Sequence, residues 1–134
     1  MKIIETVELH KVYANEDVET LALDDITFSI EEGEFVAIMG PSGSGKSTLL
    51  HILGFLDKPS AGKYYFNGKE AGSYDQEEMA HIRNREMGFV FQSFNLLSRT
   101  SVLENVKLPL LYSKFPERKW NEMALGAIRA VGLE

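Results

Sequence analysis

Eight consecutive residues, Gly40 to Ser47, read Gly-Pro-Ser-Gly-Ser-Gly-Lys-Ser. They fit the pattern Gly-x-x-x-x-Gly-Lys-Ser/Thr at every fixed position. The five residues before them, Phe35 to Met39, are all apolar, which is typical of a parallel strand covered on both faces. After them, leucines 49, 50 and 53 lie on one face at helical spacing and predict a helix over 46–56. The motif therefore has a strand before it and a helix after it.

Each residue type in this loop suits the binding of phosphate groups. Glycines let the backbone turn its N–H groups inward, and the start of a helix adds unpaired N–H groups and the positive end of its dipole. Lys46 can reach the β- and γ-phosphates of a nucleotide, and the Ser47 hydroxyl can ligate Mg²⁺. A chance glycine-rich turn is the alternative, and the flanking strand and helix disfavour it. The predicted phosphate contacts are Gly40, Ser42, Gly43, Ser44, Gly45, Lys46, Ser47 and Thr48.

The N-terminal portion of the chain is rich in strand patterns. Apolar and polar residues alternate over 3–9 and 26–30, which predicts two strands with a loop or hairpin tip over 14–20. A short aromatic strand is predicted over 63–67, closed by Asn67-Gly68. With the strand at 35–39 and the helix after it, these patterns predict an α/β fold.

Helix signals dominate the second half of the chain. Ser73-x-x-Gln76 resembles a capping box for a helix that ends near residue 85, and a second buried-type strand is predicted over 87–91. Ser101-x-x-Glu104 is a further capping box, for a short helix that Pro109 stops or kinks. The last predicted helix carries one apolar stripe and has Gly132 at its C-cap position. The stripe consists of Trp120, Met123, Ala124, Ala127, Ile128 and Val131.

Composition excludes several classes of protein. The 134 residues include 14 Lys and Arg against 20 Asp and Glu, so the net charge of −6 disfavours a mainly electrostatic nucleic-acid binder. The absence of cysteine excludes disulfides, thiolate catalysis and Cys-ligated zinc. No apolar run approaches the ~18 residues of a membrane span, and no signal peptide is visible. We therefore expect a soluble, cytoplasmic protein with one domain.

Three segments carry a resemblance to a known family. Residues 33–50 resemble the phosphate-loop region of ATP-binding cassette (ABC) ATPases, Gly88-Phe89-Val90-Phe91-Gln92 resembles that family's Q-loop, and Ser101 to Val106 resembles the segment beyond it. The resemblance extends from residue 3 to residue 133. It implies an ABC ATPase (P-loop NTPase) core with an N-terminal antiparallel β portion. Residues 89–97 and 104–110 look most like the branch of lipoprotein-releasing, macrolide-export and antimicrobial-peptide-export ATPases.

The resemblance implies roles for residues outside the phosphate loop. Tyr13 matches the aromatic residue that stacks on adenine, and Gln92 matches the glutamine that faces Mg²⁺ and orients the attacking water. ATP and Mg²⁺ are thus the implied cofactors, Lys46 and Gln92 the catalytic residues, and Ser47 and Gln92 the metal contacts. Ser93 to Leu97 match the region where the family meets its membrane subunits. From the residues alone, Tyr13 and Gln92 could be ordinary strand-end residues, and the apolar side chains at 94, 96 and 97 could fill a core.

Parts that the family needs for hydrolysis do not occur in these residues. No Leu-Ser-Gly-Gly-Gln signature and no apolar run ending in Asp-Glu follow Gln92, and the last histidine is His81. We therefore expect residues 1–134 to be the N-terminal part of a single incomplete ABC ATPase domain, which binds ATP without useful hydrolysis. Open sheet edges would then favour marginal stability or self-association.

For a complete protein, the resemblance implies a head-to-tail homodimer that holds two MgATP molecules. Transmembrane permease subunits would convert its cycle into export or extraction of a substrate, placing it at the inner face of the membrane, with no nucleic-acid partner. Three alternatives stay open at this point. They are a non-transport cassette ATPase acting on DNA or ribosomes, a P-loop kinase or GTPase (although Asn-Lys-x-Asp is absent), and a nucleotide-binding remnant without hydrolysis.

Overall fold

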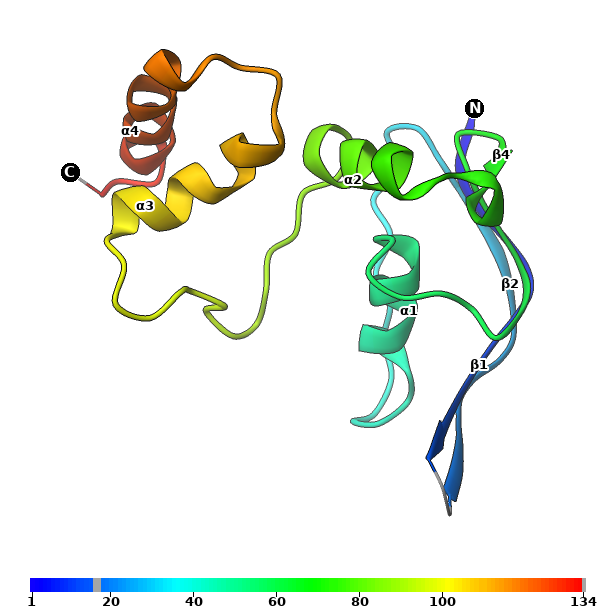
Figure 1. Ribbon diagram of the computed structural model, residues 1–134. Coiled ribbons are helices and arrows are strands. Elements are labelled where there is room, and N and C mark those ends of the chain that lie inside the picture. The colour runs from blue at the N-terminus through cyan, green and yellow to red at the C-terminus, as the bar shows by residue number, and fades with distance from the viewer. Residues whose placement is uncertain (16–17, 134) are drawn as a thin grey trace. The chain divides into compact units, whose positions relative to one another are not determined.

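The computed structural model describes residues 1–15 and 18–133. The chain forms two compact units, Met1–Gln76 and Glu77–Glu134, and each is described by itself (Figure 1). The first contains a sheet, one α-helix and a short 3₁₀-helix. The second contains the remaining helices and a long irregular segment.

An antiparallel sheet in the order β2-β1-β3-β4 forms most of the first unit. Its strands are β1 (Lys2–Asn15), β2 (Val18–Glu31), β3 (Ala61–Phe66) and β4 (Lys69–Glu70). The predicted N-terminal antiparallel β portion is thus confirmed, with longer strands than the alternation indicated. Most of the predicted loop over 14–20 is strand, because β1 and β2 pair out to Asn15 and Val18. The remaining residues of that loop, 16 and 17, lie outside the described residues.

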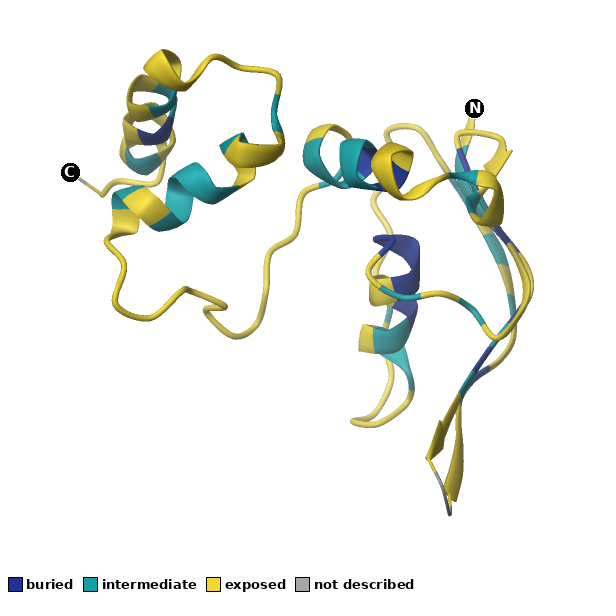
Figure 2. Ribbon diagram, in the orientation of Figure 1, coloured by how far each residue is buried: buried dark blue, intermediate teal, exposed yellow. Residues whose placement is uncertain are grey.

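The core of the first unit lies between this sheet and α1 (Lys46–Leu53) (Figure 2). The helix buries Leu49, Ile52 and Leu53, whereas Leu50 is half exposed, so the predicted buried face was wrong at Leu50. Positions 49, 52 and 53 follow the i, i+3, i+4 spacing of one helical face, and position 50 lies off that face. The core side chains from the strands and from the segment after α1 are Leu9, Leu23, Phe55, Tyr64 and Phe66.

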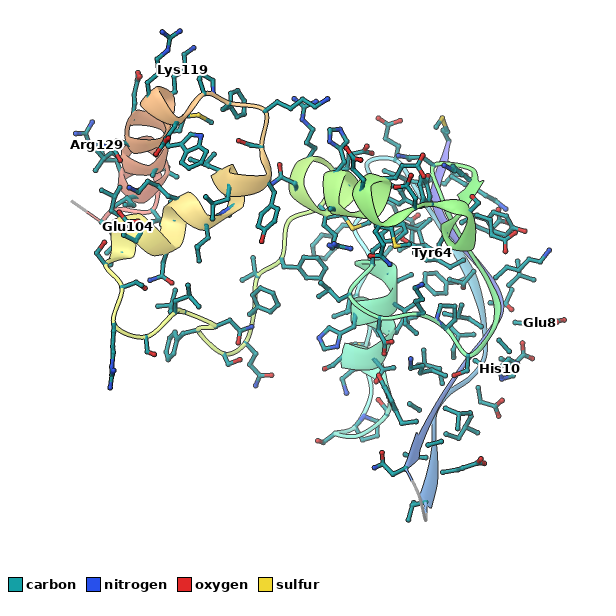
Figure 3. All side chains as sticks on the ribbon, viewed as in Figure 1. Glu8, His10, Tyr64, Glu104, Lys119 and Arg129 are labelled. Carbon is teal, nitrogen blue, oxygen red and sulfur yellow. The ribbon has the colours of Figure 1, made fainter. Side chains whose placement is uncertain are left out.

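Tyr64 fastens β3 to the end of α1. Its hydroxyl donates to the Leu53 carbonyl over 2.7 Å, and its ring lies 5.3 Å from the ring of Phe55 (Figure 3). Burial raises the pKa of the Tyr64 hydroxyl well above its usual value, with a smaller contribution from Tyr74. The neutral hydroxyl is therefore part of the packed core.

The predicted buried strand over 35–39 does not form. These residues have no regular structure, and Phe35 and Met39 are 95% and 89% exposed. A strand forms only when its backbone hydrogen-bonds to a neighbouring strand, and no strand among the described residues pairs with this run. The predicted strand is therefore wrong in this structure, because an apolar pattern contains no information about whether partner strands are within reach.

The second predicted strand, over 87–91, is also absent. Val90 is fully exposed, and the rings of Phe89 and Phe91 stack on each other at 5.7 Å. Here too, no described strand pairs with the segment. The two residues therefore contact each other instead of neighbouring strands.

Short helices make up the rest of the chain. They are η1 (Ala71–Ser73), α2 (Gln76–Arg85), α3 (Val102–Lys107), η2 (Leu108–Tyr112), η3 (Glu117–Lys119) and α4 (Trp120–Ala130). Among the described residues, no helix is long and apolar enough to cross a membrane.

The predicted helix ends are confirmed in three cases and wrong in one. The Ser101 hydroxyl accepts from the Glu104 N–H over 3.1 Å, as a capping residue does. α3 ends at Lys107, before Pro109, and Gly132 follows α4 with a φ of 77°. The Ser73 capping box is wrong, because this hydroxyl donates to the Glu70 carbonyl and α2 begins only at residue 76.

The apolar stripe of α4 is only partly buried. Ala124 is 2% exposed and Trp120, Met123 and Ile128 are intermediate, whereas Ala127 and Val131 are exposed. α3 packs against α4 but leaves Ala127 and Val131 exposed, so it covers only part of the stripe.

Candidate functional site

The glycine-rich loop leads directly into α1 in the first unit. Gly45 is the N-cap residue in the left-handed conformation, with φ 86°, and its carbonyl accepts from the Leu49 N–H over 2.9 Å. Before it, the Ser44 N–H donates to the Pro41 carbonyl over 3.3 Å and closes a turn. The N–H groups of the first helical turn have no carbonyl partner within the helix. They are therefore available to an anion at this end of α1.

Gly45 is required by its conformation and also by packing. A Cβ atom at this position would lie against the Ala22 carbonyl oxygen and 2.9 Å from Leu23 Cδ2, both on β2. Gly43 also has a positive φ, 81°, but a Cβ atom there would meet open space. β2 thus packs against the junction of loop and helix and holds it in place.

The Lys46 side chain folds back over the glycine-rich loop and its ammonium group bonds to the loop backbone. Its Nζ donates to the carbonyl oxygens of Gly40, over 2.9 Å, and Pro41, over 2.6 Å, and lies 3.3 Å from Ser44 Oγ. A positive charge is therefore held beside the first turn of α1. Both features attract a polyanion such as a nucleotide phosphate chain.

The donors at this site fit phosphate groups and a phosphate-bound Mg²⁺ ion. Ser47, in the first turn of α1, is exposed and supplies a hydroxyl oxygen. Among the described residues, no group of three or more His, Cys, Asp or Glu side chains could hold a metal ion. Mg²⁺ is commonly bound through one or two side chains and the phosphates of its substrate, which a hydroxyl beside a phosphate site can support.

Tyr13 lies on β1 of the same unit, and two neighbours hold its ring. Its hydroxyl donates to Asp57 Oδ2 over 2.8 Å, and the Lys11 ammonium lies over the ring, 4.8 Å from its centroid. Partial burial raises the pKa of Asp57, but hydrogen bonds from Lys11, Tyr13 and the Lys58 N–H outweigh it, and the pKa is below its usual value. With 43% exposure, the Tyr13 side chain is accessible to a flat ligand.

Lys11 and Asp57 were not among the residues predicted from the sequence. They are separated by 46 positions, and only the fold brings Lys11 Nζ within 2.7 Å of Asp57 Oδ1. No motif in the sequence links these two residues.

Gln92 and the segment Ser93–Leu97 belong to the second unit and are exposed. Phe94 is 90% exposed, and Leu96 and Leu97 are 66% and 53% exposed. In this structure, these side chains do not fill a core. Because Gln92 and the phosphate loop lie in different units, the predicted role of Gln92 at the metal stays a prediction.

Asn105 holds the end of this exposed segment to α3. Its Oδ1 accepts from the Leu97 N–H over 2.8 Å, and its Nδ2 donates to Thr100 Oγ1 over 2.7 Å and to the Ser101 carbonyl over 3.0 Å. The string Glu-Asn-Val at 104–106 supported the family resemblance, but its structural role was not predicted. The asparagine fixes the turn that leads into α3.

Comparisons with known proteins agree with the resemblance. A family profile described as ABC transporter matches residues 23–134. An uncharacterized ABC transporter ATP-binding protein of Thermotoga maritima is 47% identical over 132 residues, which are 98% of this chain and 56% of the relative. The macrolide export ATP-binding/permease protein MacB of Chlorobaculum tepidum is 49% identical over 98% of this chain and 20% of its own length.

Solved structures show the same fold class. The dimeric structure of MJ0796, described as a bacterial ABC transporter cassette, has a TM-score of 0.85 at 40% identity and covers 98% of this chain and 58% of that chain. A second structure of MJ0796, with the same TM-score, is described as a dimeric post-hydrolysis state bound to ADP and Pi. This chain thus spans little more than half the length of these cassettes, and its fold is that of part of an α/β P-loop core.

Proposed function

The chain belongs to the ABC transporter family, and on this premise we propose that it supplies the nucleotide-contacting part of an ATPase that drives export or extraction of a substrate. Residues 1–134 would belong to one ABC ATPase domain. The observation that supports this most is the position of the Lys46 ammonium, inside the glycine loop and beside the first turn of α1. The macrolide-export relatives named MacB support the export branch.

Residues of the first unit would hold ATP at two places. The loop and the first turn of α1 would bind the phosphates through backbone N–H groups and Lys46, and the exposed ring of Tyr13 would stack on adenine. Ser47 would contact Mg²⁺, which neutralises phosphate charge during transfer to water. Gln92 would complete the metal contacts and orient the attacking water.

We also propose that residues 1–134 alone bind ATP and do not turn it over at a useful rate. The signature segment, the Asp-Glu pair and the switch histidine of the family are not in this sequence. Without a general base and the second metal-holding carboxylate, the attacking water is not activated.

The exposed segment Ser93–Leu97 would contact transmembrane permease subunits. Its three large apolar side chains, at 94, 96 and 97, are suited to an apolar groove of a partner. Such partners would place the protein at the cytoplasmic face of the membrane. A head-to-tail homodimer of the complete protein is supported by the dimeric state named for MJ0796.

Nucleotide titration tests the proposal. MgATP is titrated calorimetrically into the chain, into Lys46→Ala and into Lys63→Ala, which removes an exposed lysine on β3 as a charge-matched control. We expect Lys46→Ala to weaken binding at least about tenfold, since a charge-assisted phosphate contact is lost, and Lys63→Ala to bind like the unchanged chain. Equal affinity in all three proteins would contradict the phosphate site.

Phosphate release tests the lack of hydrolysis. The unchanged chain is expected to release phosphate from MgATP no faster than Lys46→Ala. A clearly faster rate would show that residues 1–134 hydrolyse ATP by themselves and would overturn this part of the proposal.

A further inference from the structure

We propose that Lys11 and Asp57 are positioning residues that set the place of the Tyr13 ring for a nucleotide base. This inference rests on the proposed function, because it assumes that a base stacks on Tyr13. The side-chain hydrogen bonds of Lys11 and Asp57 join them to each other, to Tyr13 and to Lys58, and none of these partners belongs to the phosphate loop. The effect of Lys11 and Asp57 would act through Tyr13 alone.

Asp57 holds two side chains at once, one with each carboxylate oxygen. Oδ1 accepts from Lys11 Nζ over 2.7 Å, and Oδ2 accepts from the Tyr13 hydroxyl over 2.8 Å. Lys11 Nζ also donates to the Lys58 carbonyl over 2.7 Å and lies over the Tyr13 ring. The ring is thus fixed at its hydroxyl end by Asp57 and at one face by the ammonium group. Its remaining exposed surface is what a base can use.

The segment after α1 connects this cluster to the phosphate-binding helix. The N–H groups of Leu56 and Asp57 donate to the His51 carbonyl in α1, over 2.8 and 3.2 Å. At eight residues and about 1.5 Å per residue, α1 is about 12 Å long and has the phosphate loop at its other end. Asp57 is therefore held by the same helix whose first turn faces the phosphates.

β1 binds the same segment on both sides of Lys11. The Ser60 N–H donates to the His10 carbonyl over 2.9 Å, and Ser60 Oγ accepts from the Val12 N–H over 3.0 Å. These bonds prevent Asp57 and the strand that carries Tyr13 from moving independently. α1, Asp57 and Tyr13 thus form one continuous support between the phosphate site and the base site.

The Lys11 ammonium and the Asp57 carboxylate stabilise each other's charge. The Lys11 side chain is largely buried, with 11% exposure, and a buried ammonium without a partner is costly. Removing the Asp57 carboxylate would leave Lys11 without its carboxylate partner and would free the Tyr13 hydroxyl. Because the Tyr13 hydroxyl already donates its hydrogen bond to Asp57, it has no donor left for a base, and stacking on the ring does not depend on which base is bound. The loss should therefore be the same for different bases.

The test compares nucleotides with a base-free polyphosphate. MgATP, MgGTP and Mg-tripolyphosphate are titrated into the chain, Asp57→Ala, Tyr13→Phe and Tyr13→Ala, with Glu19→Gln as a charge control on the exposed part of β2. We expect Asp57→Ala to weaken ATP and GTP alike by about tenfold, since most of one stacking contact is lost. Tyr13→Phe, which keeps the ring but loses the bond to Asp57, should weaken both about threefold. Tripolyphosphate should bind all variants within twofold.

The outcomes separate this inference from the proposed function. If Tyr13→Ala binds ATP like the unchanged chain, then stacking on Tyr13 is wrong. If Tyr13→Ala weakens ATP but Asp57→Ala and Tyr13→Phe do not, stacking stands and the positioning role is overturned. Weaker tripolyphosphate binding in Asp57→Ala would show a general structural role instead. Should Asp57→Ala fail to fold by circular dichroism, Tyr13→Phe decides: unchanged ATP affinity would overturn the inference.

Discussion

The antiparallel sheet of the first unit and the apolar run between β2 and α1 differ in how their backbone groups find partners. β1 is of mixed composition, yet Thr6 and Leu9 are fully buried between paired strands. The run Phe35–Met39 is apolar throughout, yet its first and last side chains are almost fully exposed. In these two regions, burial therefore follows strand pairing more closely than it follows the hydrophobicity of the segment.

Sequence distance explains the difference. β1 and β2 are consecutive strands whose pairing begins at Asn15 and Val18, close in sequence, and β3 and β4 are joined by the tight turn Asn67-Gly68. Parallel strands are joined by longer crossovers and need neighbours from distant parts of a chain. Among the described residues, neither 35–39 nor 87–91 has such a neighbour.

The largest effect is expected where β2 supports the phosphate loop. Gly45→Ala forces a left-handed alanine against the Ala22 carbonyl and Leu23, so it should lower the free energy of unfolding by about 4 kcal/mol and abolish MgATP binding. Gly43 has a similar positive φ, but a Cβ atom there would meet open space, so Gly43→Ala should cost only about 1 kcal/mol. Denaturant unfolding and nucleotide titration measure both. Equal costs would mean that β2 does not hold the loop.

One truncation in the packed core and one in an unpaired apolar run test whether the two regions differ in burial. Ile52→Ala leaves a cavity in the core between α1 and the sheet and should lower the free energy of unfolding by about 3 kcal/mol. Val90→Ala, at a fully exposed position of the run 87–91, should change it by less than about 0.5 kcal/mol. Urea denaturation followed by circular dichroism provides the measurement. A cost at Val90 comparable to that at Ile52 would show that the second run is packed in solution.

Above pH 10, the free energy of unfolding should depend on the ionisation of Tyr64. Its pKa is raised in the folded state, so its contribution is complete below the unfolded pKa of about 10 and is lost as the pH rises above it. We expect stability to fall by about 1.4 kcal/mol per pH unit from this group above pH 10. Tyr64→Phe should remove this part of the fall, and Tyr65→Phe, on the same strand, should retain it. Identical alkaline profiles of the two variants would refute the assignment.

The smallest effect is expected at a helix cap of the second unit. Ser101→Ala removes the acceptor for the Glu104 N–H and should destabilise α3 by about 1 kcal/mol. Faster amide exchange at residues 104 and 105, with unchanged exchange in β1, would be the expected signature. Ser93→Ala, which removes an exposed hydroxyl of the same unit away from the cap, is the matched control. Unchanged exchange in Ser101→Ala would show that the cap adds nothing to α3.

Features that depend on neighbours in sequence were predicted well. The glycine loop and the helix after it, the Ser101 cap and the Gly132 helix end each need residues only a few positions apart. Their chemistry is local, so the pattern and the structure agree. Ser73 is the exception, because the Glu70 carbonyl three residues earlier competed for its hydroxyl.

Features that depend on distant residues were missed or wrongly predicted. Leu50 was assigned to the buried face, which the packing of α1 gives to Ile52 instead. The run at 35–39 was likewise predicted to be a buried strand, and among the described residues it is neither paired nor buried. In both cases the sequence identifies apolar residues, and the position of other elements decides which of them are covered.

The amino-acid sequence alone therefore determined the phosphate loop and the two N-terminal strands, because each is encoded by residues close together in the chain. It also determined the family, because the family is carried by several short motifs that are each local. Only the tertiary structure placed Asp57 between Lys11 and Tyr13, and β2 beneath Gly45. Hydrogen bonds and packing contacts of this kind join residues far apart in the chain. They exist only after α1 has folded against the sheet and brought those residues within a few ångströms.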